Sequence, residues 1–330
     1  MLLTGKTTER PVLKLNTRGP ASPAVSPPPK HPPTRRPLDL RATLLVLVLC
    51  AIWGLQPVVV KTILGDVAPT MQLSIRFFGS AIFFGAWLLF REGRRAFTDG
   101  TLRSGLLLGS AFALEFVFMG VALAHTTAAH TIVFLYSAPI FTALGLQFLP
   151  EERLRSVQWA GIGLAFLGIV VAFLGNGGRP ADEMIEGDLF ALCGGLCWGL
   201  SNVVLRRGRI GNATTIKTVF FQVAVAAVVL LVFSGYAGTT RVVLSTAAIL
   251  ALLFQTLVIA IGTYLLWFWL LRQYLTSRLM LLSLLTPVFG VALGALILDD
   301  PIDARFALGT MLVLIGILIV NARQLLQRPV

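Results

Sequence analysis

Charged residues are scarce in this 330-residue sequence. Asp, Glu, Lys and Arg make up only 13% of it, whereas 56% is hydrophobic and the mean hydropathy is +0.83. Because soluble domains carry about 25% charged residues, the composition excludes an ordinary soluble domain. The sequence predicts an all-α membrane protein in which apolar stretches of about 20 residues form membrane-spanning helices.

Residues for several kinds of chemistry are also missing. The three cysteines, Cys50, Cys193 and Cys197, lie in apolar stretches without a neighbouring His or carboxylate, a pattern typical of buried small side chains rather than a metal site. The sequence has no glycine-rich phosphate-binding loop, so ATP-driven work by this chain alone is excluded. We therefore expect no cofactor, no metal and no enzymatic activity.

The apolar stretches predict ten spans. The charge-free run 116–150 is too long for a single crossing of a hydrocarbon core about 30 Å thick, so we place a turn within its polar segment 125–130. The expected spans are 42–64, 69–90, 103–124, 128–149, 156–175, 188–206, 215–234, 247–271, 276–298 and 304–322.

A repeated pattern divides the chain into halves. The segment 53–61, Trp-Gly-Leu-Gln-Pro-Val-Val-Val-Lys, returns at 198–206 as Trp-Gly-Leu-Ser-Asn-Val-Val-Leu-Arg, and Pro139 has a counterpart in Pro287. Since each half holds five spans, an odd number, the halves must lie upside down relative to each other. We expect ten transmembrane helices arranged as two inverted five-helix repeats.

The positions of the basic residues predict the orientation. Most Lys and Arg residues fall on one side of the expected spans, and the other side holds only Lys61, Arg179, Arg241 and Arg305. Cytoplasmic loops carry the excess of Lys and Arg, so the net charge of +12 reflects topology and not binding to nucleic acid. We expect a multi-pass protein of the inner (plasma) membrane with both termini in the cytoplasm. Its expected parts are a disordered Pro-rich basic tail at 1–40, repeats at 41–176 and 187–323, and a cytoplasmic end at 324–330.

Arg76 and Glu115 are charged residues that fall well inside predicted spans, and such residues in a bilayer indicate function. Their expected depths nearly coincide on two adjacent helices. We therefore expect them to pair, either directly or through water. The alternative makes Glu115 a proton-coupling site or the site for a substrate amine.

Polar and aromatic residues at helical spacing complete a candidate substrate site. Its amides and hydroxyls suit recognition of a zwitterion, while hydrogen bonding between helices alone is the alternative. The candidate substrate-binding residues are Trp53, Gln56, Glu115, Phe134, Ser137, Trp198, Asn202, Gln255, Tyr264 and Trp267. The expected hinges are Pro57, Pro139 and Pro287, since proline interrupts the helical hydrogen-bond ladder. We interpret His125 and His130 as polar loop caps, with a pH sensor as the alternative.

Taken together, these features resemble the drug/metabolite transporter superfamily, specifically its ten-span EamA-type branch. The matching features are Trp53-Gly54 with Lys61, Pro69 followed by Arg76, Pro139 followed by Glu151 and Glu152, Gln158 with Gly161 and Gly168, Gly187-Asp188 with Trp198 and Arg206, and Pro287 with Gly309 and Gly316. The resemblance implies an inner-membrane carrier that works by alternating access and is similar to amino-acid and metabolite exporters. One departure is Asp299 and Asp300, where a Glu is usual.

The sequence therefore predicts a secondary active transporter that moves a small amphipathic metabolite, with amino acids or their analogues first and export as the direction. One alternative is a multidrug or lipophilic-cation efflux carrier in which Glu115 binds the cation. The other is a membrane-embedded transferase, for which His125, His130 and the acids of the loop near 182–188 are the available groups. We expect a lipid-embedded monomer or homodimer that binds a small-molecule substrate.

Overall fold

The computed structural model describes residues 1, 39–148, 154–174, 181–274 and 276–326. Within these ranges the chain is helical apart from turns and an antiparallel bridge between Val67 and Val242. The all-α prediction is therefore confirmed for the described part. Most of the expected tail and the last residues of the C-terminal end lie outside it.

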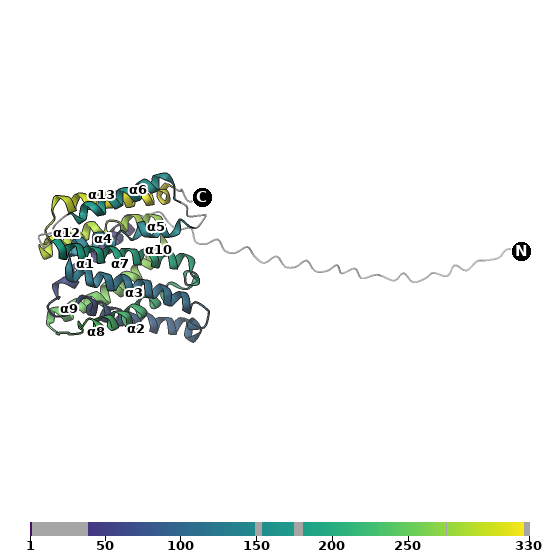
Figure 1. Ribbon diagram of the computed structural model, residues 1–330. Coiled ribbons are helices and arrows are strands. Elements are labelled where there is room, and N and C mark those ends of the chain that lie inside the picture. The colour runs from purple at the N-terminus through teal and green to yellow at the C-terminus, as the bar shows by residue number, and fades with distance from the viewer. Residues whose placement is uncertain (2–38, 149–153, 175–180, 275, 327–330) are drawn as a thin grey trace. The chain divides into compact units, whose positions relative to one another are not determined.

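The helices follow one another as long rods joined by short turns (Figure 1). They are α1 (Leu40–Thr62), α2 (Pro69–Glu92), α3 (Leu102–His125), α4 (Ala128–Leu135), α5 (Ala138–Leu146), α6 (Ser156–Phe173), α7 (Ala181–Arg207), α8 (Thr215–Tyr236), α9 (Thr246–Leu253), α10 (Thr263–Gln273), α11 (Thr276–Ser283), α12 (Thr286–Leu298) and α13 (Ala304–Leu326). The described residues also form two 3₁₀-helices, η1 (Gly93–Phe97) and η3 (Arg209–Asn212), and a π-helix, η4 (Phe254–Gly262).

Eight helical segments of the described chain are long and apolar enough to cross a membrane, as expected for a multi-pass membrane protein. They are Leu40–Thr62, Pro69–Phe97, Leu102–His125, Ala128–Leu146, Ser156–Phe173, Met184–Arg207, Thr215–Tyr236 and Thr246–Gln273. Two shorter apolar helices, Thr286–Leu298 and Ala304–Val320, follow them.

The breaks between helices occur at the residues that the sequence singled out. The long apolar run turns between α3 and α4, where the Thr127 hydroxyl caps α4 by accepting a hydrogen bond of 3.0 Å from the His130 amide. Pro139 and Pro287 each lie in the first turn of a new helix, where the missing N–H costs no hydrogen bond. By contrast, α1 continues through Pro57.

Glycines bring α6 and α13 into close contact (Figure 1). An added Cβ at Gly168 would lie 2.7 Å from the Gly309 carbonyl oxygen, and one at Gly161 would lie 2.9 Å from the Gly316 carbonyl oxygen. Contacts under 3.0 Å leave no room for a methyl group, so small residues are required here. The pairing of 161 with 316 and of 168 with 309 also shows that the two helices run antiparallel.

The two Trp-Gly segments make matching contacts. A Cβ added to Gly54 of α1 would lie 2.7 Å from the Gly290 amide nitrogen and 3.0 Å from the Phe289 Cβ of α12. A Cβ added to Gly199 of α7 would lie 3.0 Å from the Thr142 amide nitrogen and 2.6 Å from the Phe141 Cβ of α5. Gly54 therefore lets α1 approach α12, which carries Pro287 in its first turn, and Gly199 lets α7 approach α5, which carries Pro139 in its first turn.

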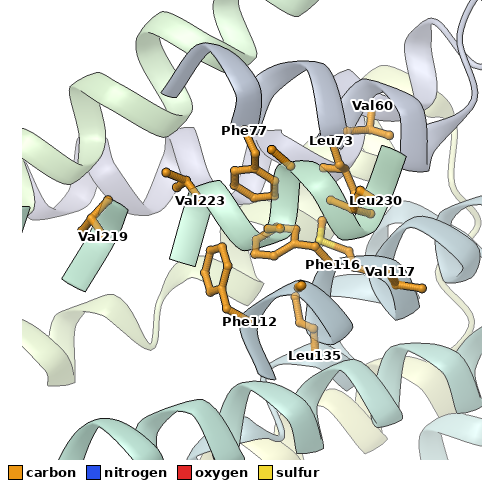
Figure 2. Close-up of a cluster of buried hydrophobic side chains, with 14 of the residues drawn as sticks. Val60, Leu73, Phe77, Phe112, Phe116, Val117, Leu135, Val219, Val223 and Leu230 are labelled. Carbon is orange, nitrogen blue, oxygen red and sulfur yellow. The ribbon is translucent and has the colours of Figure 1, made fainter. Parts of the chain in front are cut away.

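The largest apolar cluster lies between α2, α3 and α8. Figure 2 shows Phe77 of α2 and Phe112 and Phe116 of α3 at its centre, with Val219, Val223 and Leu230 of α8 beside them. The guanidinium of the buried Arg76 lies against two of these rings, those of Phe77 and Phe116.

Candidate functional site

Arg76 of α2 and Glu115 of α3 are both buried, with 1% and 4% of their surfaces exposed. The direct ion pair expected from their matching depths does not form. Within the described part of the chain, Nε and Nη1 of Arg76 and Oε2 of Glu115 have no hydrogen-bond partner. An approach through water stays a prediction. Because unpaired charges are costly away from water, a third group that supplied partners to these atoms would stabilise the arrangement.

Two phenyl rings hold the Arg76 guanidinium. Its central carbon lies 4.4 Å from the centroid of Phe77 and 5.0 Å from that of Phe116. The two rings meet edge to face, with centroids 4.7 Å apart (Figure 2). Cation–π contacts stabilise the buried charge through the faces of the rings, but they leave N–H donors of the guanidinium without acceptors.

Two tyrosines complete this region. Tyr264 of α10 is within electrostatic reach of both Arg76 and Glu115, and Tyr136, between α4 and α5, is within reach of Glu115. We call Arg76, Glu115, Tyr136 and Tyr264 the central cluster. Trp198 of α7 packs edge-on against Tyr136 with centroids 5.1 Å apart. The cluster thus joins residues from both halves of the chain.

The candidate residues of α1 lie beside this cluster. The Trp53 indole donates a 3.0 Å hydrogen bond to the hydroxyl of Thr263, the residue before Tyr264, and its ring lies 5.3 Å from that of Trp267. The Gln56 amide is 3.6 Å from the sulfur of Met119, one turn along α3 from Glu115. Trp53, Gln56 and Trp267 therefore border the central cluster.

Gln255 lies in the π-helix η4, a feature that the sequence did not predict. Its amide donates a 2.9 Å hydrogen bond to Gln72 Oε1, and the Gln72 amide donates to the carbonyls of Val60 and Val67 at 2.9 and 2.8 Å. Gln255 thus ties η4 to the turn between α1 and α2, although no partner of its Oε1 lies among the described residues. π-helical segments are frequent at functional sites.

Three other candidates make hydrogen bonds or contacts that hold helices together. Ser137 donates a 2.7 Å hydrogen bond to the Phe134 carbonyl at the break before α5. The Phe134 ring is fully buried, 4.5 Å from that of Phe173 in α6. The Asn202 amide donates to the Thr142 hydroxyl at 3.2 Å. Ser137 directly follows Tyr136 of the central cluster, but in the described part of the chain the hydrogen bonds of Ser137 and Asn202 go to other residues.

Sequence reasoning missed the role of His130. His130 lies inside α4 rather than in a loop, and it is fully buried. Its Nδ1 is 2.8 Å from Asp188 Oδ2 of α7, and the other carboxylate oxygen accepts a 2.7 Å hydrogen bond from the Thr126 hydroxyl. The ring stacks on Phe306 of α13 with centroids 4.0 Å apart. The loop-cap interpretation of His130 is therefore wrong.

Other groups converge on the same turn, 126–130. The Lys61 ammonium at the end of α1 donates to the Thr126 carbonyl, and Asp300 Oδ2, from the segment between α12 and α13, accepts a 3.1 Å hydrogen bond from the Ala129 amide. The Val67–Val242 bridge is at this end of the helices as well. We call this region, comprising segments 61–67, 126–130, 187–188, 239–245 and 299–303, the histidine end.

The opposite ends of the helices meet through a different set of contacts. The Lys217 ammonium at the start of α8 forms an ion pair of 2.5 Å with Asp99, which also accepts a hydrogen bond from the Thr101 hydroxyl. Lys217 holds the pKa of Asp99 well below its usual range, at about 2. We call this region, comprising segments 92–104 and 207–217, the Asp99 end.

Comparisons with known proteins agree with this architecture. A model of the EamA-like transporter family matches residues 40–174 and 185–322. The chain is 29% identical over 289 residues to a protein of Escherichia coli named a probable amino-acid metabolite efflux pump, covering 83% of this chain and 93% of that one. It is 25% identical to the uncharacterized transporter YoaV of Bacillus subtilis, covering 84% and 96%. A solved structure titled only as a crystal structure of protein shares the fold, with a TM-score of 0.60 at 21% identity over 86% of this chain and 98% of that one.

Proposed function

The chain belongs to the EamA-like transporter family, and from that premise we propose that it is a secondary active transporter for a small amphipathic metabolite, exported across the inner membrane by alternating access. The observation that carries the proposal is the central cluster. Arg76 and Glu115 lie buried within spans with atoms that lack partners in the described structure. A solute that crosses the membrane would supply those partners.

Matching contacts in the two halves support an arrangement of ten spans as inverted repeats. The pairs α4–α5 and α11–α12 each form one broken span, and α9, η4 and α10 together form another. The approach of Gly54 to α12 has its counterpart in the approach of Gly199 to α5. In the sequence repeat, Gly161 of α6 corresponds to Gly309 of α13, and Gly168 corresponds to Gly316. In the contact between the two helices the pairing is crossed, because Gly161 faces Gly316 and Gly168 faces Gly309. Such pairing is typical of a twofold relation in which one half is inverted.

Amino acids or their analogues are the substrates that fit the site best. Charges of both signs, phenolic hydroxyls and aromatic rings lie together in the central cluster. Two of the relatives are named amino-acid metabolite efflux pumps, at 29% and 28% identity. A lipophilic cation is less well suited, because the Arg76 charge lies near Glu115 and repels it.

Flux through reconstituted protein tests the proposal. Purified protein in liposomes preloaded with a mixture of unlabelled leucine, phenylalanine, methionine and serine should take up a labelled member of the mixture by counterflow. The uptake should saturate, because a carrier binds its solute at a limited number of sites. Liposomes without protein are the control. Flux that rises without saturation would indicate a channel, and chemical conversion without flux would indicate an enzyme.

A further inference from the structure

Arg76 and Glu115 are opposite charges that are buried in the same region and kept apart. A pair that served structure alone would gain most by closing into a hydrogen-bonded ion pair, since an unpaired charge in a low-dielectric interior is strongly destabilising. Instead, the described structure leaves donors of Arg76 and an acceptor of Glu115 unused. The separation therefore calls for a ligand with complementary groups at two points.

The aromatic residues explain why the pair stays open. Phe77 and Phe116 flank the guanidinium at 4.4 and 5.0 Å, and Phe112 packs 4.8 Å from Phe116. Phe116 follows Glu115 on α3, so the same helix supplies both the carboxylate and one of the rings that stabilise Arg76. Arg76 is thus positioned by packing and needs no contact with Glu115 to stay in place.

The charge balance selects the ligand. Arg76 and Glu115 together carry no net charge, so a ligand with a single charge would leave an unbalanced charge within the membrane, where it is costly. A zwitterion adds no net charge and supplies a partner of the correct sign to each residue. The guanidinium is the side chain best suited to a carboxylate, and the Glu carboxylate accepts hydrogen bonds from an ammonium.

We propose that Arg76 and Glu115 together bind the zwitterionic head group of an α-amino acid, with its carboxylate on the Arg76 N–H groups and its ammonium on Glu115 Oε2. This inference rests on the proposed transport function and specifies its substrate class. The rings of Tyr136 and Tyr264 within the cluster, and of Trp198 packed against Tyr136, favour an apolar side chain on the ligand.

Ligands with the same side chain and different head groups test this assignment. Each set contains a zwitterion, the corresponding amine and the corresponding carboxylate. The first set is phenylalanine, phenethylamine and 3-phenylpropionate. The second is leucine, 3-methylbutylamine and 4-methylpentanoate. Binding is measured by ligand-induced thermal stabilisation and by competition for counterflow. Wild-type protein should bind the zwitterion of at least one set about 10-fold or more tightly than either singly charged analogue, because only the zwitterion satisfies both residues.

Variants at the two positions should lose different ligands. Arg76→Gln should weaken binding of the zwitterion and the carboxylate about 10- to 100-fold and leave the amine nearly unchanged. Glu115→Gln should weaken binding of the zwitterion and the amine and leave the carboxylate nearly unchanged. Arg76→Lys and Glu115→Asp keep the charges and replace the glutamine variants in this test if those do not fold. They should retain the order of preference at lower affinity.

Lys217→Gln and Asp188→Asn are matched controls, since they remove a buried cation and a buried carboxylate that have partners elsewhere. They should change stability without changing head-group preference.

Equal losses for all three head groups in the Arg76 and Glu115 variants, or an unchanged preference, would overturn the inference. If another solute shows saturable counterflow and no amino acid binds, this inference fails and the transport function stands. If no solute shows saturable flux, the proposed function fails as well.

Discussion

The two ends of the helices are joined by different physical means. At the histidine end the central ion pair is buried, with His130 fully enclosed and Asp188 only 1% exposed. At the Asp99 end the side chain of Lys217 is 1% exposed, but that of Asp99 is 46% exposed. Water stabilises the exposed carboxylate when its ion pair separates, whereas separating buried partners leaves charges unsolvated.

The connections at the histidine end also reach more of the chain. α1, α7 and the segment before α13 each place a charged side chain on the turn 126–130. At the Asp99 end the ion pair joins one loop to one helix. The Asp99 end has further contacts, since the Ile210 amide donates a 3.2 Å hydrogen bond to the Ser104 hydroxyl and the Thr214 hydroxyl donates to Glu92. The two ends therefore differ in the burial of their ion pairs: opening the histidine end separates a buried pair, whereas opening the Asp99 end separates a pair whose carboxylate is already half exposed to water.

A disulfide bond across the histidine end should have the largest effect on transport. Val67→Cys with Val242→Cys places two thiols at the antiparallel bridge of the histidine end, in a background in which Cys50, Cys193 and Cys197 are replaced. If transport requires this end to open, oxidation should reduce counterflow to the level of protein-free liposomes, and a reductant should restore it. Each single-cysteine variant is the control. Normal flux through the cross-linked protein would show that this end does not open.

Loss of the buried carboxylate should have the next largest effect. Asp188→Ala removes the acceptor of both His130 and Thr126 inside the protein, and breaking a buried charged pair costs about 3–5 kcal/mol. The effect is measured as the change in the free energy of unfolding in detergent. Asp99→Ala, at the exposed pair, should destabilise the protein much less. Equal effects of the two substitutions would contradict the difference between the ends.

His130→Asn should have an intermediate effect. The asparagine amide can still donate to Asp188, so the charge stays partnered, but the stacking on Phe306 is lost. We expect a loss of about 1–2 kcal/mol. His125→Asn is the matched control at the same end, because His125 is only half-buried and lies at the end of α3. It should change stability by less than about 0.5 kcal/mol.

The response of Asp99 to pH should be the smallest effect. Its pKa is lowered to about 2 by Lys217, so the folded state favours the ionised form. The contribution is present above the ordinary pKa near 4 and is lost as the pH falls towards 2. The amides of residues 98–101 should therefore be at least as well protected from hydrogen exchange at pH 8 as at pH 5. At pH 3, after correction for intrinsic rates, they should exchange faster. They should also exchange faster at high salt, which screens the ion pair. A loss of protection between pH 5 and 8 would contradict the assignment.

The sequence predicted the helices and their breaks well. Hydropathy placed the apolar segments, the polar patch 125–130 marked the turn, and Pro139 and Pro287 marked the starts of α5 and α12. These features depend on local physics, namely the length of an apolar run and the missing N–H of proline. They can be predicted without knowing which helices are neighbours.

The partners of the buried polar residues could not be predicted in the same way. His130 and Asp188 are far apart in sequence, and their contact depends on the packing of α4 against α7. Arg76 and Glu115 were matched by depth, but Phe77 and Phe116 decide where the guanidinium lies. The π-helix around Gln255 has no local signal in the sequence and is known only from the structure.

The glycine contact between α6 and α13 is self-complementary. Gly161 faces Gly316, Gly168 faces Gly309, and the helices run in opposite directions. A second copy of α6, turned end for end, would therefore present the same pair of notches that α13 presents.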